Sequence, residues 1–303
     1  MKHPIRYRLE YIAARFLWAL FASLPVSVAS CLGGALASVA GRFPPLARRV
    51  DKNLNLAMAE LIPSQRRRIA SGVWWNLGRT LAELPHIRKF SLTHNSPKPG
   101  EIQVVGAEHI DGRDGMLLFA AHLANWEMTY FVTSKLGHPM HVVYRAPNNP
   151  LIDQWLSNLR QDLTLGAYAK GRTAARGILA ALDQGQAVGM LVDQKMNDGI
   201  VVPFFGRPAM TAPALAQLAL RRKLAVIPMR FERLTGASFR VTLEKPLTYV
   251  DTGRRKVDVP ALMGQVNDMI EAWIRERPEQ WLWPHNRWPS GDQATPLNEA
   301  VDR

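Results

Sequence analysis

A histidine and a glutamate near the middle of the chain have the residue types and spacing of an acid–base pair. His122 directly follows the apolar run 116–121, and Glu127 lies five residues further on. Residues at this spacing on one regular helix lie about 140° apart around its axis, so their side chains do not meet there. They meet if His122 lies in the turn after a strand and Glu127 in the first turn of a helix. The Glu127 carboxylate would then reach Nδ1 of His122 while Nε2 faces a cleft, which is the arrangement of a general base and its orienting group.

The nucleophile of a catalytic triad has no counterpart in this sequence, because no serine or cysteine lies in a G-x-S-x-G nucleophile elbow. A hydroxyl of a substrate is then the natural nucleophile: His122 would remove its proton, and the oxygen would attack an activated acyl group directly. This favours a two-substrate transferase over a hydrolase. The alternative is a strand-end histidine that bonds to nearby backbone. We expect no metal and no tightly bound cofactor, since the order of residues differs from H-E-x-x-H and Cys31 is the only cysteine.

The elements that must position this pair are short apolar runs alternating with amphipathic stretches. Strands are expected near 102–105, 116–121, 140–145, 187–192, 201–205, 224–230 and 238–244. Helices are expected near 124–137, 150–163, 173–184, 211–222 and 258–277. Such alternation predicts an α/β fold with a central, largely parallel sheet flanked by helices, which binds substrates at the carboxyl ends of its strands.

The N-terminal region predicts a membrane anchor. Residues 16–41 carry no charged side chain and no histidine, which is long enough to span a bilayer. Pro25 and the Gly33-Gly34 pair interrupt this segment, so two shorter helices in the interface are equally consistent with it. A cleaved signal peptide and a hairpin buried on the protein's own core are the alternatives. We therefore divide the chain into an anchor at 1–43 and a catalytic domain at 44–303, helical over 44–98 and α/β over 99–303.

The charge of the chain predicts an anionic partner. Lys and Arg number 38 against 25 Asp and Glu, a formal net charge of +13 over 303 residues. Phospholipid, a phosphorylated substrate and nucleic acid all satisfy this excess. The 47 % hydrophobic and 21 % charged content is typical of a globular protein and excludes a disordered chain.

Five blocks of residues together resemble the lipid A late acyltransferases of bacterial lipopolysaccharide synthesis. They are His122–Glu127, Tyr144–Pro150, Asp193-Gln194, Val201–Gly206 and Pro278–Trp283. Their order and spacing cover nearly the whole chain, and as a set they are highly specific. The wider relatives are the glycerolphosphate acyltransferases, which carry an H-x-x-x-x-D box where this chain has glutamate.

This resemblance implies an acyl carrier protein thioester as the acyl donor and a hydroxyl of a lipid A precursor glycolipid as the acceptor. It also implies action at the cytoplasmic face of the bacterial inner membrane, in contact with anionic phospholipid and without nucleic acid. His122 would be the general base and Glu127 its partner.

Four further positions are carried over as substrate-binding residues. Arg145 and Arg160 match positions where the family carries basic residues near the acceptor, and a guanidinium suits a phosphate or carboxylate. Asp193 would face the same cleft from the end of the strand 187–192, with a turn cap as the alternative. Asn125 is typical of the family but has no defined role. Ala124 departs from the family, which usually has glycine there.

Two other functions remain open from the sequence. An acyltransferase that uses coenzyme A thioesters and another glycolipid or lysophospholipid has the same motifs. A basic membrane-binding or nucleic-acid-binding protein without catalysis satisfies the charge alone. The run Val201–Gly206 is either part of an acyl tunnel or ordinary core.

Overall fold

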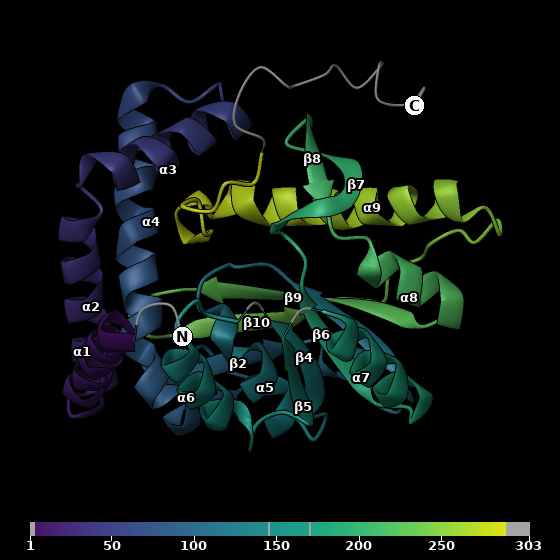
Figure 1. Cartoon of the computed structure of the whole chain (residues 1–303), viewed down its shortest axis with the longest axis horizontal. Coiled ribbons are helices and arrows are strands. Elements are labelled where there is room, and N and C mark those ends of the chain that lie inside the picture. Colours follow the sequence, from purple (N-terminus) through teal and green to yellow (C-terminus); the bar gives the residue numbers. More distant parts are fainter. Residues whose placement is uncertain (1–3, 145, 170, 289–303) are drawn as a thin grey trace.

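A computed structural model describes residues 4–144, 146–169 and 171–288 of the chain, and its centre is an eight-stranded sheet (Figure 1). The strand order is β1-β2-β10-β9-β3-β6-β4-β5. The pair β9–β10 is antiparallel, and every other neighbouring pair in this sheet is parallel. The strands of the sheet are β1 (Ser91–Thr93), β2 (Glu101–Val105), β3 (Met116–Ala120), β4 (Met140–Tyr144), β5 (Gly166–Ala169), β6 (Ala187–Leu191), β9 (Ala225–Arg233) and β10 (Phe239–Leu243). The expected α/β fold with a largely parallel sheet is confirmed.

β3 lies in the interior of this sheet and is buried along its whole length, as its uninterrupted apolar sequence predicts. Alternate side chains face opposite layers because a strand has a period of two. Leu117 and Phe119 join the core formed with helices α7, α8 and α9, and Phe119 stacks on Trp273 at 5.9 Å between ring centroids. Leu118 and Ala120 face the second core, which includes helix α5. The end of β3, where His122 follows, is therefore fixed from both sides.

The helices cover both faces of the sheet and one of its ends (Figure 1). The α-helices are α1 (Pro4–Ala22), α2 (Val26–Ala40), α3 (Pro44–Ala57), α4 (Pro63–Glu83), α5 (Thr129–Lys135), α6 (Pro150–Arg160), α7 (Arg172–Asp183), α8 (Ala214–Arg222) and α9 (Arg255–Glu276). The 3₁₀ turns are η1 (Leu84–Lys89), η2 (Ala107–His109), η3 (Trp126–Met128) and η4 (Pro278–Gln280). The helix expected over 124–137 thus begins as a 3₁₀ turn that carries Glu127.

The N-terminal segment folds into two helices that meet at Pro25, as the proline predicts. Helix α2 packs along α4, where Gly33 and Gly78 bring the two backbones into close contact. Among the described residues, no single helix is both long enough and apolar enough to cross a membrane, although α2 and α3 together pass that test with a 95° bend between them. The expected membrane-anchoring helix is therefore not established by the fold.

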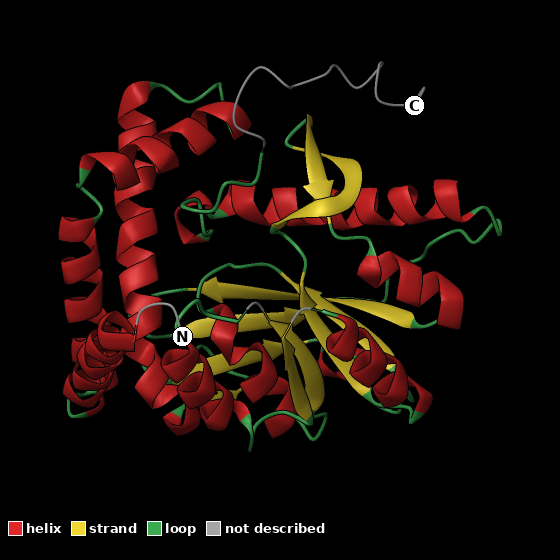
Figure 2. Cartoon of the chain, in the orientation of Figure 1, coloured by secondary structure: helices red, strands yellow, loops and turns green. Residues whose placement is uncertain are grey.

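A two-stranded hairpin stands apart from the sheet and packs against α9 (Figure 2). It consists of β7 (Lys195–Phe204) and β8 (Arg207–Thr211), which pair antiparallel. The strand expected at 201–205 lies here, so its apolar side chains are not in the sheet. β1, β5 and β8 had no counterpart among the expected strands, because these runs are short and carry little apolar periodicity.

The chain after α9 returns across the carboxyl end of β3. Leu123 forms an isolated antiparallel bridge with Trp281, and the backbone N–H of Ala124 donates to the carbonyl of Gln280 at 3.0 Å. Buried Arg287 then donates to the carbonyl of Met210 and to the Thr211 hydroxyl on β8. The C-terminal block therefore ties the loop that carries His122 to the hairpin.

Candidate active site

His122 is bonded to an aspartate that follows the neighbouring strand. Nδ1 of His122 lies 2.8 Å from Oδ1 of Asp193, and the backbone N–H of His122 donates to Oδ2 at 3.0 Å. The indole N–H of Trp281 donates to the same Oδ2 at 2.7 Å. Asp193 is almost completely buried, at 1 % exposure, so its carboxylate orients His122 and does not face solvent. The histidine keeps 12 % of its side chain exposed.

The environment of Asp193 keeps it ionised. Burial alone raises the pKa of a carboxyl group, but the nearby His122 and the hydrogen bonds from His122 and Trp281 act in the opposite direction and lower the pKa of Asp193 well below its usual range. A carboxylate at Nδ1 fixes the proton of a neutral imidazole on that nitrogen. Nε2 is then the basic atom, as a general base requires.

The side-chain amide of Gln194 is hydrogen-bonded to Nε2 of His122, the basic nitrogen, in this structure. Its Nε2 lies 3.1 Å from Nε2 of His122, a geometry in which the amide N–H donates and the imidazole accepts. Sequence reasoning included Gln194 only as part of a motif and gave it no role. Its position next to Asp193, directly after a strand end, was the available signal.

Glu127 has different partners from those expected from the sequence. Its carboxylate accepts hydrogen bonds from Nη2 of Arg160, at 3.0 and 3.2 Å, and from the Tyr130 hydroxyl at 3.2 Å. Among the described residues, the carboxylate at Nδ1 of His122 is Asp193 and not Glu127. The physical reason is the parallel pairing of β3 and β6, which brings a second strand end beside His122, while the η3 turn directs Glu127 towards α6.

The ion pair between Glu127 and Arg160 is largely removed from solvent, with 22 % and 11 % of the side chains exposed. Burial by itself lowers the pKa of Arg160, but Glu127 and Tyr130 outweigh it and raise the pKa above its ordinary value. The guanidinium is therefore a permanent cation. Its Nη1 is buried and has no hydrogen-bond partner among the described residues, so the two N–H groups of this nitrogen remain free for a ligand.

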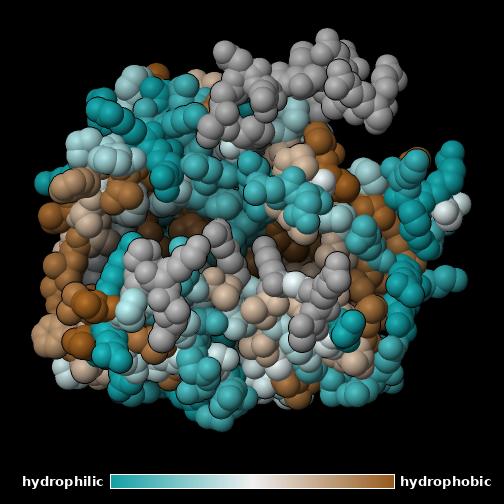
Figure 3. All heavy atoms as spheres, viewed as in Figure 1, coloured by the Kyte–Doolittle hydropathy of each residue, from teal (hydrophilic) through white to brown (hydrophobic). Residues whose placement is uncertain are grey.

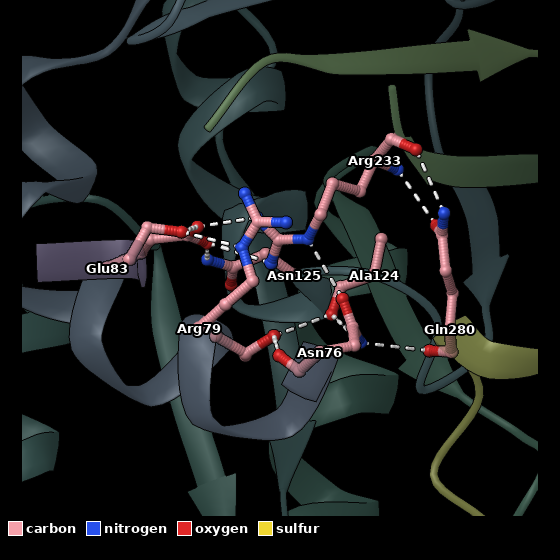
Figure 4. Close-up of polar contacts among 9 residues, drawn as sticks. Asn76, Arg79, Glu83, Ala124, Asn125, Arg233 and Gln280 are labelled. Atoms are coloured by element: carbon pink, nitrogen blue, oxygen red, sulfur yellow. Dashed lines mark hydrogen bonds and ion pairs between the residues drawn. The ribbon is translucent and has the colours of Figure 1, made fainter. Parts of the chain in front are cut away.

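Asn125 belongs to a buried polar network beneath the active-site loop (Figure 4). Its Nδ2 donates to Glu83 at 2.9 Å, and Glu83 also accepts from Arg233 on β9. Asn76 joins the same network by accepting from Nε of Arg233 at 2.9 Å. Asn125 is completely buried. These contacts favour a structural role over the substrate contact expected from the sequence.

The same network holds Ala124 in an unusual backbone conformation. Its φ is +50°, a region that favours glycine. Its carbonyl accepts from the Thr80 hydroxyl at 2.8 Å and from Nδ2 of Asn76 at 3.2 Å. Helix α4 and the C-terminal segment thus fix both sides of the peptide, and the Glu127 side chain beyond it points to Arg160 and not to His122.

Two apolar pockets adjoin this loop. The first, which we call the sheet pocket, has a cavity volume of about 50 Å³ and is lined by the sheet, α5 and Arg160. The second, which we call the helix pocket, has a cavity volume of about 210 Å³ and lies between α1, α4, η1 and α6. Trp126, Glu127, Tyr130 and Arg160 line both pockets. The Trp126 ring also packs against His122, at 5.2 Å between centroids, and so connects the pockets to the base.

Two further predictions from the sequence, at Arg145 and at the run Val201–Gly206, have different outcomes. Arg145 lies outside the described residues. The run Val201–Gly206 lies on the hairpin and does not line either pocket, so the pockets and not this run are the candidate sites for hydrocarbon. Within the described residues, no cluster of three or more His, Cys, Asp or Glu side chains has the geometry to hold a metal ion.

Fold and site together define an α/β enzyme with a carboxylate-oriented histidine that contacts two apolar pockets through Trp126. The chain belongs to the bacterial lipid A biosynthesis acyltransferase family, whose model matches residues 1–290. It is therefore an acyltransferase of lipid A biosynthesis, which confirms the resemblance of its sequence blocks.

Individual relatives match nearly the whole chain. The lipid A biosynthesis lauroyltransferase of Escherichia coli K12 is 27 % identical over 97 % of this chain and 95 % of its own length. The lipid A biosynthesis palmitoleoyltransferase of the same organism is 27 % identical over 98 % of this chain and 95 % of its own length. A lipid A biosynthesis acyltransferase of Haemophilus influenzae is 23 % identical over 88 % of this chain and 84 % of its own length.

Proposed function

We propose that this acyltransferase moves a fatty acyl group from an acyl carrier protein thioester to a hydroxyl of a lipid A precursor, with His122 as the general base. The observation that carries the proposal is the hydrogen bond between Nδ1 of His122 and the buried carboxylate of Asp193, which leaves Nε2 as the proton acceptor. Asp193 takes the orienting role expected of Glu127. The names of the relatives support the acyl transfer and the lipid A acceptor.

The reaction needs no covalent intermediate on the enzyme. Nε2 of His122 takes the proton of the acceptor hydroxyl as its oxygen attacks the thioester carbonyl carbon. The carbonyl oxygen gains negative charge in the tetrahedral intermediate, and the free Nη1 of Arg160 is the donor that we assign to it. The C–S bond then breaks, the ester forms, and the departing thiolate takes the proton from His122.

The side chains of Gln194 and Trp126 must move for this reaction to proceed. The Gln194 amide occupies the lone pair of Nε2 that the acceptor hydroxyl has to reach. The Trp126 ring packs on His122 and lines both pockets, neither of which is lined by His122 itself. Both side chains are only partly buried, which leaves room for a change of rotamer. We therefore assign the structure to a resting state in which the base is held and covered.

We assign the donor's acyl chain to the sheet pocket, whose lining is mostly apolar and includes Glu127 and Arg160. Its volume of about 50 Å³ holds only the first carbons of the chain, so the pocket must widen to take the rest. Its inner part is bounded by Met140, whose sulfur lies against Gly189. Acyl carrier protein is the donor that we assign, because the chain has a formal charge of +13 and carrier proteins are acidic. A coenzyme A thioester is the alternative that the donor assay tests.

The exposed face of α1 supports attachment to the inner membrane. Ile5, Leu9, Ile12 and Phe16 each have 62 % or more of their surface exposed, and they repeat at helical spacing. Hydrophobic side chains cover the surface over α1 and α2 at the left edge of Figure 3. Arg8 and Arg15 lie on the same helix, which suits anionic headgroups on the cytoplasmic side.

Mass spectrometry of lipid A tests the function directly. Bacterial cells that carry or lack this chain, and a His122→Ala strain, are compared. We expect the null and His122→Ala strains to lose one secondary acyl chain, whose mass gives the length of the transferred group. His138→Ala is the matched control, because this partly buried histidine pairs with Asp111 and lines neither pocket. An identical lipid A profile in all strains would refute the assigned acceptor.

The donor is tested with purified protein. Acyl carrier protein and coenzyme A thioesters of the same chain compete for one lipid A precursor. A preference of more than tenfold in kcat/KM for the carrier protein supports the assignment, and a preference for coenzyme A overturns it.

A further inference from the structure

The helix pocket is a second apolar site beside the base, separate from the sheet pocket. Its walls come from six helical elements, α1, α4, η1, η3, α5 and α6, and include Trp18, Leu84 and Leu159. Its cavity volume of about 210 Å³ exceeds the roughly 150 Å³ of an engineered apolar cavity that binds benzene. A fold with a packed core does not leave such a space for structural reasons, because interiors are filled to crystal density.

The two pockets meet at one polar wall. Glu127 and Arg160 line both pockets and form an ion pair, and Trp126 and Tyr130 also line both. Acyl transfer brings together two hydrocarbon chains, one on the donor and one next to the acceptor hydroxyl, at one polar reaction centre. The arrangement of two apolar spaces around one polar wall matches that requirement.

The helix pocket lies next to α1, the helix whose exposed apolar face we propose to contact the membrane. Trp18 of α1 packs edge-on against Trp155 of α6 at 4.9 Å between centroids, so α1 itself forms the outer wall. The opposite face of α1 carries the exposed apolar side chains such as Phe16. At the rim, Arg88 is half exposed and pairs with Asp162, which places a cation where an anionic headgroup would lie. The sheet pocket does not contact α1.

We propose that the helix pocket binds a hydrocarbon chain of the acceptor glycolipid, the chain next to the hydroxyl that is acylated. This assignment rests on the proposed function and adds the subsite that selects the acceptor. The acceptor chain enters from the apolar face at α1, passes Arg88 and ends with its hydroxyl at the Glu127–Arg160 wall. The donor chain lies on the other side of that wall.

Kinetics with two matched variants test the assignment. Leu159→Trp fills the helix pocket, and Val143→Phe reduces the sheet pocket. The purified full-length proteins are assayed with lipid A precursors whose hydroxyacyl chains differ in length, and with a series of acyl carrier protein thioesters. We expect Leu159→Trp to raise the KM for the acceptor at least tenfold and to favour shorter hydroxyacyl chains. Its donor KM and its donor chain preference should stay within twofold of wild type.

The control variant is expected to show the converse pattern. Val143→Phe should shift the donor series towards shorter acyl chains and leave the acceptor series unchanged. If Leu159→Trp fails to fold, as circular dichroism would reveal, Leu159→Ala enlarges the same pocket and should extend the preference to longer acceptor chains. A change in donor preference caused by either Leu159 variant, or no change in the acceptor series, overturns the assignment.

The failure of this inference is distinguishable from failure of the proposed function. Wild-type protein that acylates no lipid A precursor refutes the function itself. Wild-type protein that acylates the precursor, together with Leu159 variants whose acceptor kinetics are unchanged, refutes only the acceptor subsite.

Discussion

His122 and Asp193 occupy equivalent positions after two neighbouring parallel strands. Ala120 of β3 is paired in register with Leu191 of β6, and each of the two functional residues lies two positions beyond its member of that pair. The backbone N–H of Val192 donates to the carbonyl of Ala120, which extends the alignment past the strand ends. Parallel strands end at the same edge of a sheet, so the pairing of β3 with β6 places the Asp193 carboxylate beside Nδ1 of His122.

The first prediction concerns which carboxylate orients the base. Asp193→Asn keeps the shape of the side chain, but two N–H donors hold its amide oxygen at the Oδ2 position, so its NH2 group faces Nδ1 and favours the wrong imidazole tautomer. We therefore expect kcat to fall by about 10⁴-fold, as for the orienting carboxylate of a catalytic triad. The proton NMR signal of the Nδ1–H, expected far downfield in wild type, should be lost as well.

Glu127→Gln is the comparison variant. It should lower activity by releasing Arg160 from its ion pair, and it should leave the Nδ1–H signal in place. The opposite pattern, with the signal retained in Asp193→Asn and lost in Glu127→Gln, would make Glu127 the partner of His122 after all.

The second prediction concerns acid stability. The pKa of Asp193 is lowered in the folded protein because contacts with His122 and Trp281 outweigh the effect of burial. A carboxylate with a lowered folded pKa stabilises the fold fully above the unfolded value of about 4, and this stabilisation is lost as the pH falls below it. The difference in unfolding free energy between wild type and Asp193→Asn should therefore narrow from pH 5 to pH 3 in urea titrations. A difference that does not vary with pH would contradict this.

The third prediction concerns the backbone at Ala124, whose φ of +50° is costly for a residue with a Cβ atom. Ala124→Gly should raise the free energy of unfolding by up to about 1 kcal/mol, because glycine adopts this conformation without steric cost. Ala121→Gly is the matched control, since Ala121 is also buried but is not in the left-handed region. It should lower the free energy by about 0.5–1 kcal/mol. Equal effects at the two positions would show that the left-handed backbone carries no strain.

The fourth prediction concerns the contact between α2 and α4. A Cβ atom at Gly78 would lie 2.1 Å from the carbonyl oxygen of Gly33 and 2.4 Å from the Cβ of Ala37. Gly78→Ala should therefore separate the helices and lower the free energy of unfolding by about 1–3 kcal/mol. Gly264→Ala in α9, where a Cβ atom meets open space, should instead stabilise the helix by up to about 1 kcal/mol. Thermal or urea unfolding measures both, and similar effects would show that α2 does not pack closely on α4.

The sequence predicted the sheet well because its strands are apolar and separated by amphipathic helices. β3 and β6 lie where the apolar runs 116–121 and 187–192 place them. Pro25 likewise predicted the break between α1 and α2. The hairpin β7–β8 was harder to predict, because an apolar strand has the same local pattern whether it joins a sheet or packs on a helix.

The sequence by itself determined the fold class, the family and the position of His122 after a strand, because these depend on local pattern and on motifs along the chain. The tertiary structure alone decided which carboxylate reaches His122. Five residues of chain separate Glu127 from the histidine and 71 separate Asp193. The turn at Ala124 directs Glu127 away from His122. Asp193 lies beside His122 because β3 and β6 pair, and the spacing of residues along the chain does not predict that pairing.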